Sequence, residues 1–189
     1  MQVNKRGILM IFLVLLVSVI VVIVPTFFTK GVSRVVLHKE INLPLILNDN
    51  KDIKLLFFGY SGCADICTPR LYMIDKLYKR LDKESKKRVG FEFLDISVPF
   101  DEELPQRFAS FFNNEFKGIY LEKDILRSYT KAFDVYFSPS LMDKSSFDHT
   151  AHLYLLKRTE SRKEIRYIYN AYPYDIEQII KDIKELIDE

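Results

Sequence analysis

Apolar and polar residues alternate along the chain with two different periods. Residues 54–59 form an apolar run of strand length that ends in glycine, which is typical of a strand buried on both faces. Residues 69–81 carry apolar side chains at spacings of three and four, which predicts an amphipathic helix with Pro69 in its first turn. The pattern therefore predicts a buried strand, a loop over residues 60–66 and a helix covering that strand.

The same alternation continues to the end of the chain. Strands are predicted at residues 91–97, 118–120, 151–156 and 165–169, and helices at residues 104–112, 122–133 and 175–187. A charged turn over residues 157–163 predicts a hairpin of the last two strands, and residues 136–148 are predicted to be a long loop. This order favours an α/β, thioredoxin-like fold in which helices flank a central mixed sheet.

The first 28 residues differ from the rest in composition. Ser18 is the only polar residue between positions 8 and 24, and a helix over residues 8–28 would span about 31 Å, close to the hydrocarbon thickness of a bilayer. A cleaved signal peptide is the alternative, but no small-residue cleavage site follows the apolar run. We therefore expect a cytoplasmic N-terminus at residues 1–6, an uncleaved transmembrane anchor at 7–28, a polar stalk at 29–42 and one globular domain at 43–189.

Basic residues flank both ends of this apolar segment, so charge counting alone does not settle its orientation. Lys5 and Arg6 precede it, whereas Lys30, Arg34 and Lys39 follow it. An N-terminal anchor with basic residues at its front usually leaves the following domain outside the cytoplasm. We adopt that orientation as an expectation: a single-pass protein of a bacterial-type inner membrane, with its domain facing the periplasm or the cell exterior, which are oxidising compartments.

Net charge excludes one class of partner. The 28 basic and 26 acidic residues give a net charge of +2, which provides no field for binding nucleic acid. The lysine-rich residues 79–88 are interrupted by acidic ones and are interpreted as a solvated helix end. A domain of about 150 residues buries enough apolar surface without disulfides, so stability does not require the two cysteines.

Cys63 and Cys67 are the only cysteines, and they lie at the predicted junction of strand and helix. If the helix begins early, both thiols share one face near its positive end, which favours the thiolate. Thiolates favour Cu(I), and an imidazole is a suitable third ligand for copper or zinc. The alternatives are a bracing disulfide, which would restrict the unfolded chain little because its loop is short, or two buried thiols that only pack.

Two motifs of the chain resemble those of a known protein family. Residues 57–69, Phe-Phe-Gly-Tyr-Ser-Gly-Cys-Ala-Asp-Ile-Cys-Thr-Pro, are similar to the cysteine signature of the Sco/SenC family, although Ala64 replaces its usual proline. The tripeptide Asp148-His149-Thr150 precedes an apolar strand, as a similar tripeptide does in the family. The resemblance spans residues 43–187 and implies that Cys63, Cys67 and His149 bind one copper ion, Cu(I) or Cu(II). It also implies delivery of that copper to the subunit of cytochrome c oxidase that carries CuA.

The other two histidines are weaker candidates for the third ligand. His152 competes with His149, but it is expected in the following strand, where alternation would turn it to the opposite side. His38 lies in the predicted stalk and is interpreted as a linker residue. His149 itself has an alternative interpretation as a loop histidine that is hydrogen-bonded to a backbone carbonyl.

Three functions fit the sequence. The first is a membrane-anchored copper metallochaperone, which is not an enzyme and which receives copper from a donor protein or needs a protein thiol reductant. The second is an extracytoplasmic thiol-disulfide oxidoreductase that uses Cys63 and Cys67 without His149. The third is an interaction module without chemistry. A thioredoxin-fold peroxidase is disfavoured because residues 57–63 lack the Pro-x-x-x-Thr/Ser-x-x-Cys pattern.

Overall fold

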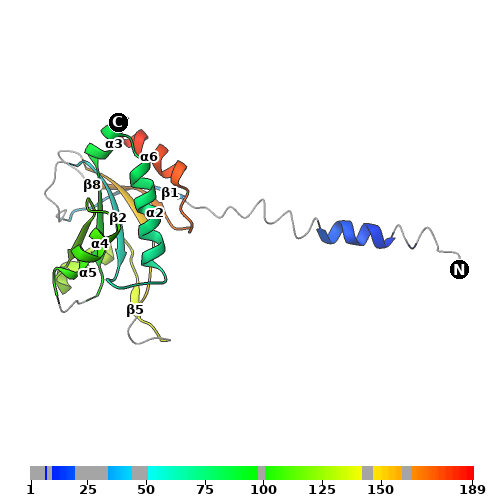
Figure 1. The fold of residues 1–189 in the computed structure, drawn as a ribbon, viewed down its shortest axis with the longest axis horizontal. Coiled ribbons are helices and arrows are strands. Elements are labelled where there is room, and N and C mark those ends of the chain that lie inside the picture. The colour runs from blue at the N-terminus through cyan, green and yellow to red at the C-terminus, as the bar shows by residue number, and fades with distance from the viewer. Residues whose placement is uncertain are drawn as a thin grey trace. The chain divides into compact units, whose positions relative to one another are not determined.

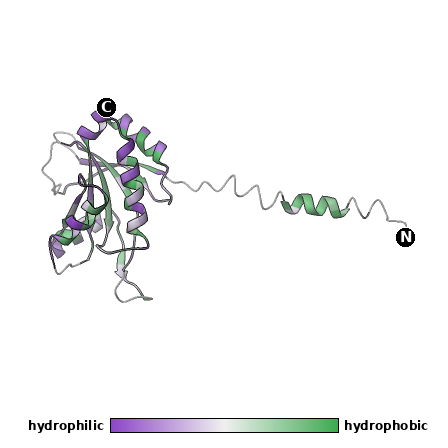
Figure 2. Ribbon diagram, viewed as in Figure 1, coloured by the Kyte–Doolittle hydropathy of each residue, from purple (hydrophilic) through white to green (hydrophobic). Residues whose placement is uncertain are grey.

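The computed structural model describes residues 7, 10–19, 34–43, 51–97, 101–141, 147–158 and 163–189. The chain divides into two units, Met1–Val32 and Ser33–Glu189. In the first unit, residues 10–19 form a helix of exposed, mostly apolar residues (Figure 2). None of the helices in the described ranges is both long and apolar enough to cross a membrane. Residues 8–9 and 20–28 of the anchor predicted at residues 7–28 lie outside the described residues.

The second unit is built on a mixed sheet. Within the described residues, six strands are ordered β1-β8-β7-β2-β3-β4. The parallel half contains β2 (Ile53–Gly59), β3 (Val89–Asp95) and β4 (Lys117–Tyr120). The other half contains β7 (Leu153–Arg158), β8 (Lys163–Tyr169) and β1 (Arg34–Glu40). Strand β7 pairs antiparallel with β2, β8 pairs antiparallel with β7, and β1 pairs antiparallel with β8. The predicted central mixed sheet is confirmed.

Helices cover both faces of this sheet (Figure 1). Phe57 and Phe93 belong to the core beneath α2 (Cys67–Arg80), α4 (Leu104–Phe112) and α6 (Ile176–Asp188). Phe58 and Leu94 belong to the core on the opposite face, beneath α5 (Lys123–Ala132). Because β2 and β3 are buried on both faces, their sequences are mostly apolar rather than alternating, and their charged residues Lys54, Glu92 and Asp95 are buried as well.

One predicted assignment differs from the structure at the start of the domain. Residues 29–42 were expected to be a stalk, but β1 occupies residues 34–40 and pairs with β8, so the folded unit begins before residue 43. A register shift between Val36 and Lys39 breaks the alternation that would reveal a strand, and β1 lies at the sheet edge. The basic residues after α2, which the sequence indicated as part of a solvated helix end, form a separate helix, α3 (Lys83–Arg88). The Asp82 carboxylate caps this helix.

The predicted long loop over residues 136–148 contains a second pairing. Strands β5 (Phe137–Pro139) and β6 (Phe147–His149) pair as a short antiparallel sheet, with Phe137 opposite His149. Each strand has three residues, which is too few for a periodic signal to be recognised in the sequence. His149 therefore lies at the end of a strand rather than in a loop.

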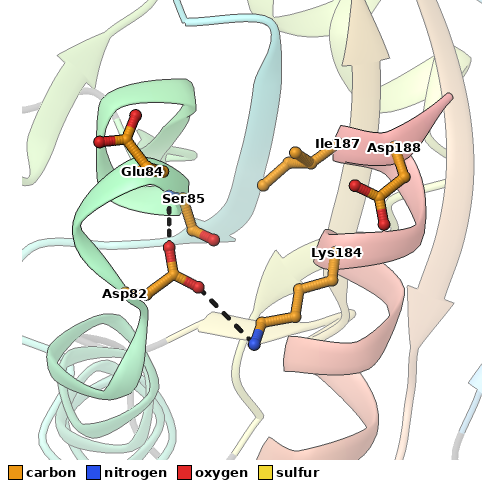
Figure 3. A pocket seen from close by; sticks show the side chains of 6 residues that line it. All are labelled: Asp82, Glu84, Ser85, Lys184, Ile187 and Asp188. Carbon is orange, nitrogen blue, oxygen red and sulfur yellow. Dashed lines mark hydrogen bonds and ion pairs between the residues drawn. The ribbon is translucent and has the colours of Figure 1, made fainter.

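A pocket of about 260 Å³ lies between α3 and α6 (Figure 3). Two of its charged side chains are paired with each other, since the Asp82 carboxylate, which also accepts from the Ser85 backbone N–H, lies 3.6 Å from Lys184 Nζ. Helix α3 leads into the beginning of β3, which runs parallel to β2. The pocket therefore lies at the opposite end of these strands from the cysteines, which follow the end of β2.

Candidate metal centre

Antiparallel pairing of β2 with β7 brings distant parts of the chain together. Phe57, near the end of β2, is opposite Leu153, the first residue of β7. The loop that follows β2 carries Cys63 and leads into α2 at Cys67, whereas β6 ends at His149, four residues before Leu153. The end of one strand and the beginning of its neighbour therefore meet at the same edge of the sheet.

At this edge, Cys63, Cys67 and His149 each offer one donor atom, and the three atoms all lie within 4.8 Å of one another. The Sγ atom of Cys67 is 3.7 Å from Nε2 of His149. Both cysteines are buried free thiols, and His149 is half-buried. Sulfur and imidazole donors at this separation can converge on a single soft metal ion.

The imidazole of His149 is oriented by a backbone contact. Its Nδ1 atom lies 3.0 Å from the carbonyl oxygen of Thr150. Because a carbonyl can only accept a hydrogen bond, we assign the ring proton to Nδ1, which leaves the Nε2 lone pair directed toward Cys67. This is the arrangement in which metal-binding histidines are usually held, and the contact with the Thr150 carbonyl is of the kind that the alternative interpretation of His149 expected.

Cys63 lies at the N-terminus of α2. Its Sγ atom accepts a hydrogen bond of 3.2 Å from the Cys67 backbone N–H. The Thr68 hydroxyl donates to the Cys63 carbonyl at 2.8 Å, which fixes the entry into the helix. The predicted placement of a thiol at the positive end of the helix holds for Cys63, while Cys67 is the first residue of the helix itself.

The two thiols are electrostatically coupled. A hydrogen bond from the Cys67 thiol lowers the pKa of Cys63, and the neighbouring side chain of His149 acts in the same direction. The same interaction with Cys63, together with burial, raises the pKa of Cys67. The metal-free pair therefore shares one proton, with a thiolate at Cys63 and a thiol at Cys67.

Two glycines allow the cysteine segment to approach the sheet. A Cβ atom at Gly59 would lie 2.7 Å from Cys67 Sγ and 2.8 Å from the Phe93 ring. Gly62 has a φ angle of 90°, which side chains other than glycine rarely adopt. The position of Cys67 therefore depends on the absence of a side chain at the end of β2.

Asp95, at the end of β3, anchors the same segment from the neighbouring strand. Its side chain is fully buried, and its Oδ2 accepts from the Ser61 backbone N–H at 2.9 Å and the Ser61 hydroxyl at 2.5 Å. Its Oδ1 accepts in the same way from Ser97, at 2.8 and 2.5 Å. Asp95 thus fixes the loops that follow both β2 and β3. No motif in the sequence indicated this role, because the predicted strand continued to residue 97 and did not end at Asp95.

Aromatic rings form the wall of the site. His149 makes edge contacts with the rings of Tyr60 and Phe57, at centroid distances of 6.0 and 6.5 Å. Burial, followed by a hydrogen bond with Cys63, raises the pKa of Tyr60 to about 12, so its phenol keeps its proton at neutral pH. These rings shield the donor atoms from solvent.

The remaining histidines lie outside the group. His152 was expected in a strand, but it lies just before β7, half-buried, with its ring 6.2 Å from that of Tyr154. His38 lies in β1, where its Nδ1 is 3.9 Å from Glu164. Among the described residues, the cluster of candidate metal ligands contains His149 and neither of these two.

Comparison with solved structures gives consistent matches. An apo Sco1 from Thermus thermophilus is 22% identical over 84% of this chain and 95% of its own, with a TM-score of 0.62. A copper-bound ScoI from Arabidopsis thaliana is 18% identical over 72% and 84%, with a TM-score of 0.62. BsSco, a member of the Sco family of cytochrome c oxidase assembly proteins with a disulfide switch, is 20% identical over 71% and 80%, with a TM-score of 0.52.

These identities support a shared fold. A search of curated protein sequences finds no match. The sequence profile of SCO1/SenC, however, matches residues 50–188, which include Cys63, Cys67 and His149 and all of the sheet except β1. The chain therefore belongs to the SCO1/SenC family.

Proposed function

We propose that the protein is a copper metallochaperone that binds one copper ion through Cys63, Cys67 and His149. The observation that carries the proposal is the convergence of two free thiols and one imidazole nitrogen within 4.8 Å. Two sulfur donors favour Cu(I), and the imidazole is also a suitable ligand for Cu(II). The copper-bound ScoI from Arabidopsis thaliana, whose fold is similar, supports the choice of metal.

The protonation of the two thiols is suited to a metal that must be bound and then released. Cys63 offers a thiolate, whereas copper must displace the proton of Cys67, so binding releases about one proton. The donors lie at an edge of the sheet and His149 is only half-buried, so a partner can approach from that side. A chaperone needs such access, because it must pass its metal to another protein.

The recipient in this proposal is the cytochrome c oxidase subunit that carries CuA. The description of BsSco as belonging to a family of oxidase assembly proteins supports this choice. The proposal also includes an N-terminal anchor at residues 7–28, which holds the domain on the outer side of a bacterial-type inner membrane. The apolar run over residues 8–24, in which Ser18 is the only polar residue, supports the anchor. Extraction of membranes with alkaline carbonate would test it, because an anchored chain stays in the pellet.

Copper binding is tested by titrating the reduced protein with Cu(I) in the presence of a competing chelator. We expect one copper per chain. Loss of an outer-shell partner of a metal ligand typically costs about 10- to 100-fold in metal affinity. His149→Ala should weaken copper binding by more than this, because it removes a direct ligand. His152→Ala is the matched control and should bind like the wild type. Equal affinities for all three proteins would contradict the proposal.

A thiol-disulfide oxidoreductase is the second candidate, favoured by the unequal pKa values of the two cysteines. A thiolate beside a protonated thiol is suited to disulfide exchange, in which Cys63 attacks a substrate disulfide and Cys67 then displaces the reduced substrate. Catalysed reduction of a protein disulfide with a thiol donor would measure this activity. Rapid turnover that is unchanged in His149→Ala, together with no copper uptake, would favour the oxidoreductase over the chaperone.

A further inference from the structure

Arg70 is a partly buried cation beside the cysteine pair. It follows Cys67 by three positions in α2, a separation at which two side chains are neighbours on one helix face. Its Nη1 donates to the Ile66 carbonyl at 3.3 Å, and its guanidinium carbon lies 4.7 Å from the centre of the Tyr172 ring. Its Nε is buried without a hydrogen-bond partner among the described residues. The guanidinium is therefore held in place by the protein rather than free in solvent.

One peptide group connects Arg70 to Cys63. The carbonyl of the peptide between Ile66 and Cys67 accepts from Arg70 Nη1, and the N–H of the same peptide donates to Cys63 Sγ at 3.2 Å. These two distances and the fixed dimensions of a peptide keep Nη1 within about 9 Å of the Cys63 sulfur. A cation at the carbonyl also polarises the peptide, which strengthens its N–H as a donor to the sulfur. The charge of Arg70 therefore reaches the sulfur atoms of the site.

No carboxylate balances this charge within the part of the chain that the structure describes. Asp75, further along α2, is paired with Lys79 instead. The first turn of a helix is also an unfavourable place for a cation, because the positive end of the helix dipole lies there. Since charges that are withdrawn from water are normally paired, an anionic group at the metal centre would provide the missing partner of Arg70.

Two thiolates and a neutral imidazole give an anionic copper centre in one of the two oxidation states. With Cu(I) the thiolate charges exceed the metal charge by one, whereas with Cu(II) they cancel it. We propose that Arg70 is a specificity-determining residue, which favours Cu(I) over Cu(II) by pairing its positive charge with the anionic cuprous centre. The proposal deepens the proposed function and rests on Cys63, Cys67 and His149 being the ligands.

The proposal is tested by measuring the Cu(I) and Cu(II) affinities of the full chain in detergent, with a competing chelator for each ion. Arg70→Gln should lower the ratio of Cu(I) to Cu(II) affinity by about tenfold, the effect of one unit charge at about 9 Å in partly solvated protein. In the one-electron couple this corresponds to a reduction potential that is lower by about 59 mV. Arg70→Lys keeps the charge and should lie closer to the wild type.

Lys76→Gln is the matched control, because it removes one positive charge from an exposed position of the same helix. Its affinity ratio should equal that of the wild type. A purely structural role of Arg70 would weaken the binding of both ions together and leave the ratio unchanged. An unchanged ratio in Arg70→Gln, or an equal fall in Arg70→Lys or Lys76→Gln, would overturn the proposal.

A second measurement needs no copper. In equilibrium with glutathione, the Cys63 and Cys67 thiols and one glutathione disulfide exchange to give the protein disulfide and two molecules of reduced glutathione. The reduced pair carries one thiolate and the disulfide carries no charge, so Arg70→Gln should shift this equilibrium toward the disulfide by about tenfold. An unchanged equilibrium would overturn the action of Arg70 on the cysteines. If the wild type bound no copper, the proposed function itself would fail, whereas copper binding with an unchanged affinity ratio would overturn only the role of Arg70.

Discussion

Cys67 Sγ and His149 Nε2 lie 3.7 Å apart although 82 positions separate the two residues in the chain. The separation is closed by the pairing of β2 with β7, which places the end of the strand before the cysteine loop beside the beginning of the strand after His149. The site is thus a product of sheet topology, and its geometry depends on residues that hold the intervening loops.

Gly59 is the first of these residues. In Gly59→Ala, the new methyl group would overlap Cys67 Sγ and the Phe93 ring, so we expect a loss of about 1–3 kcal/mol of stability and weaker copper binding. Gly90→Ala is the control, because the nearest atoms to a Cβ there belong to the side chains of Lys51 and Lys54, at 3.2 Å or more, and not to the metal centre. Thermal unfolding and Cu(I) titration of both variants measure the effects. Equal copper affinities would show that Gly59 does not position Cys67.

Ser61 and Ser97 form a matched pair around Asp95. Each donates a backbone and a hydroxyl hydrogen bond to one carboxylate oxygen, so Ser61→Ala and Ser97→Ala should each cost about 1.5–3 kcal/mol. Only Ser61 belongs to the cysteine loop. We therefore expect about a tenfold loss of copper affinity in Ser61→Ala and near wild-type affinity in Ser97→Ala. The account of Asp95 would be wrong if both variants lost affinity equally.

The protonation of the cysteines gives a prediction for the metal-free, reduced protein. The lowered pKa of Cys63 means that its thiolate persists as the pH falls below about 8.5, the ordinary thiol value, whereas the raised pKa of Cys67 keeps that thiol protonated. Ultraviolet thiolate absorbance at pH about 6 should therefore correspond to one thiolate per chain. Cys63→Ser should abolish this signal. Absorbance that appears only at alkaline pH would contradict the shared-proton description.

A buried ion pair provides a test of the fold that leaves the metal centre untouched. Lys54 Nζ lies 3.2 Å from Glu92 Oε1, and both side chains are 1% exposed. Lys54→Met should cost about 3–5 kcal/mol, because it leaves a buried carboxylate without its cation, and the double variant with Glu92→Leu should recover much of that loss. Chemical denaturation measures both. Copper affinity should not change, since neither residue contacts the site.

Much of the fold follows from the sequence where one period persists over a whole element. The apolar run before Gly59 predicted β2, and the isoleucines of the last segment predicted α6, whose N-terminus the Asp175 side chain caps. The spacing of Cys63 and Cys67 predicted a thiol at a helix N-terminus, because a strand and a helix could be recognised on either side. These features depend on local interactions, which the sequence records directly.

Other features depend on contacts between distant segments. The edge strand β1 has no regular alternation, and it forms because β8 offers a free edge. Pairing of β5 with β6 depends on three residues in each strand. Asp95 is ordinary in the sequence, and its role becomes visible only when Ser61, 34 residues away, lies beside it. Sequence periodicity carries no signal for such contacts.

X-ray absorption spectroscopy of the Cu(I)-loaded protein tests the central claim most directly, because it counts the atoms bound to copper. The account predicts one copper per chain, coordinated by two sulfur atoms and one imidazole nitrogen, and loss of the imidazole contribution in His149→Ala but not in His152→Ala. Copper bound by sulfur alone in the wild-type protein, or an imidazole contribution that survives in His149→Ala, would contradict it.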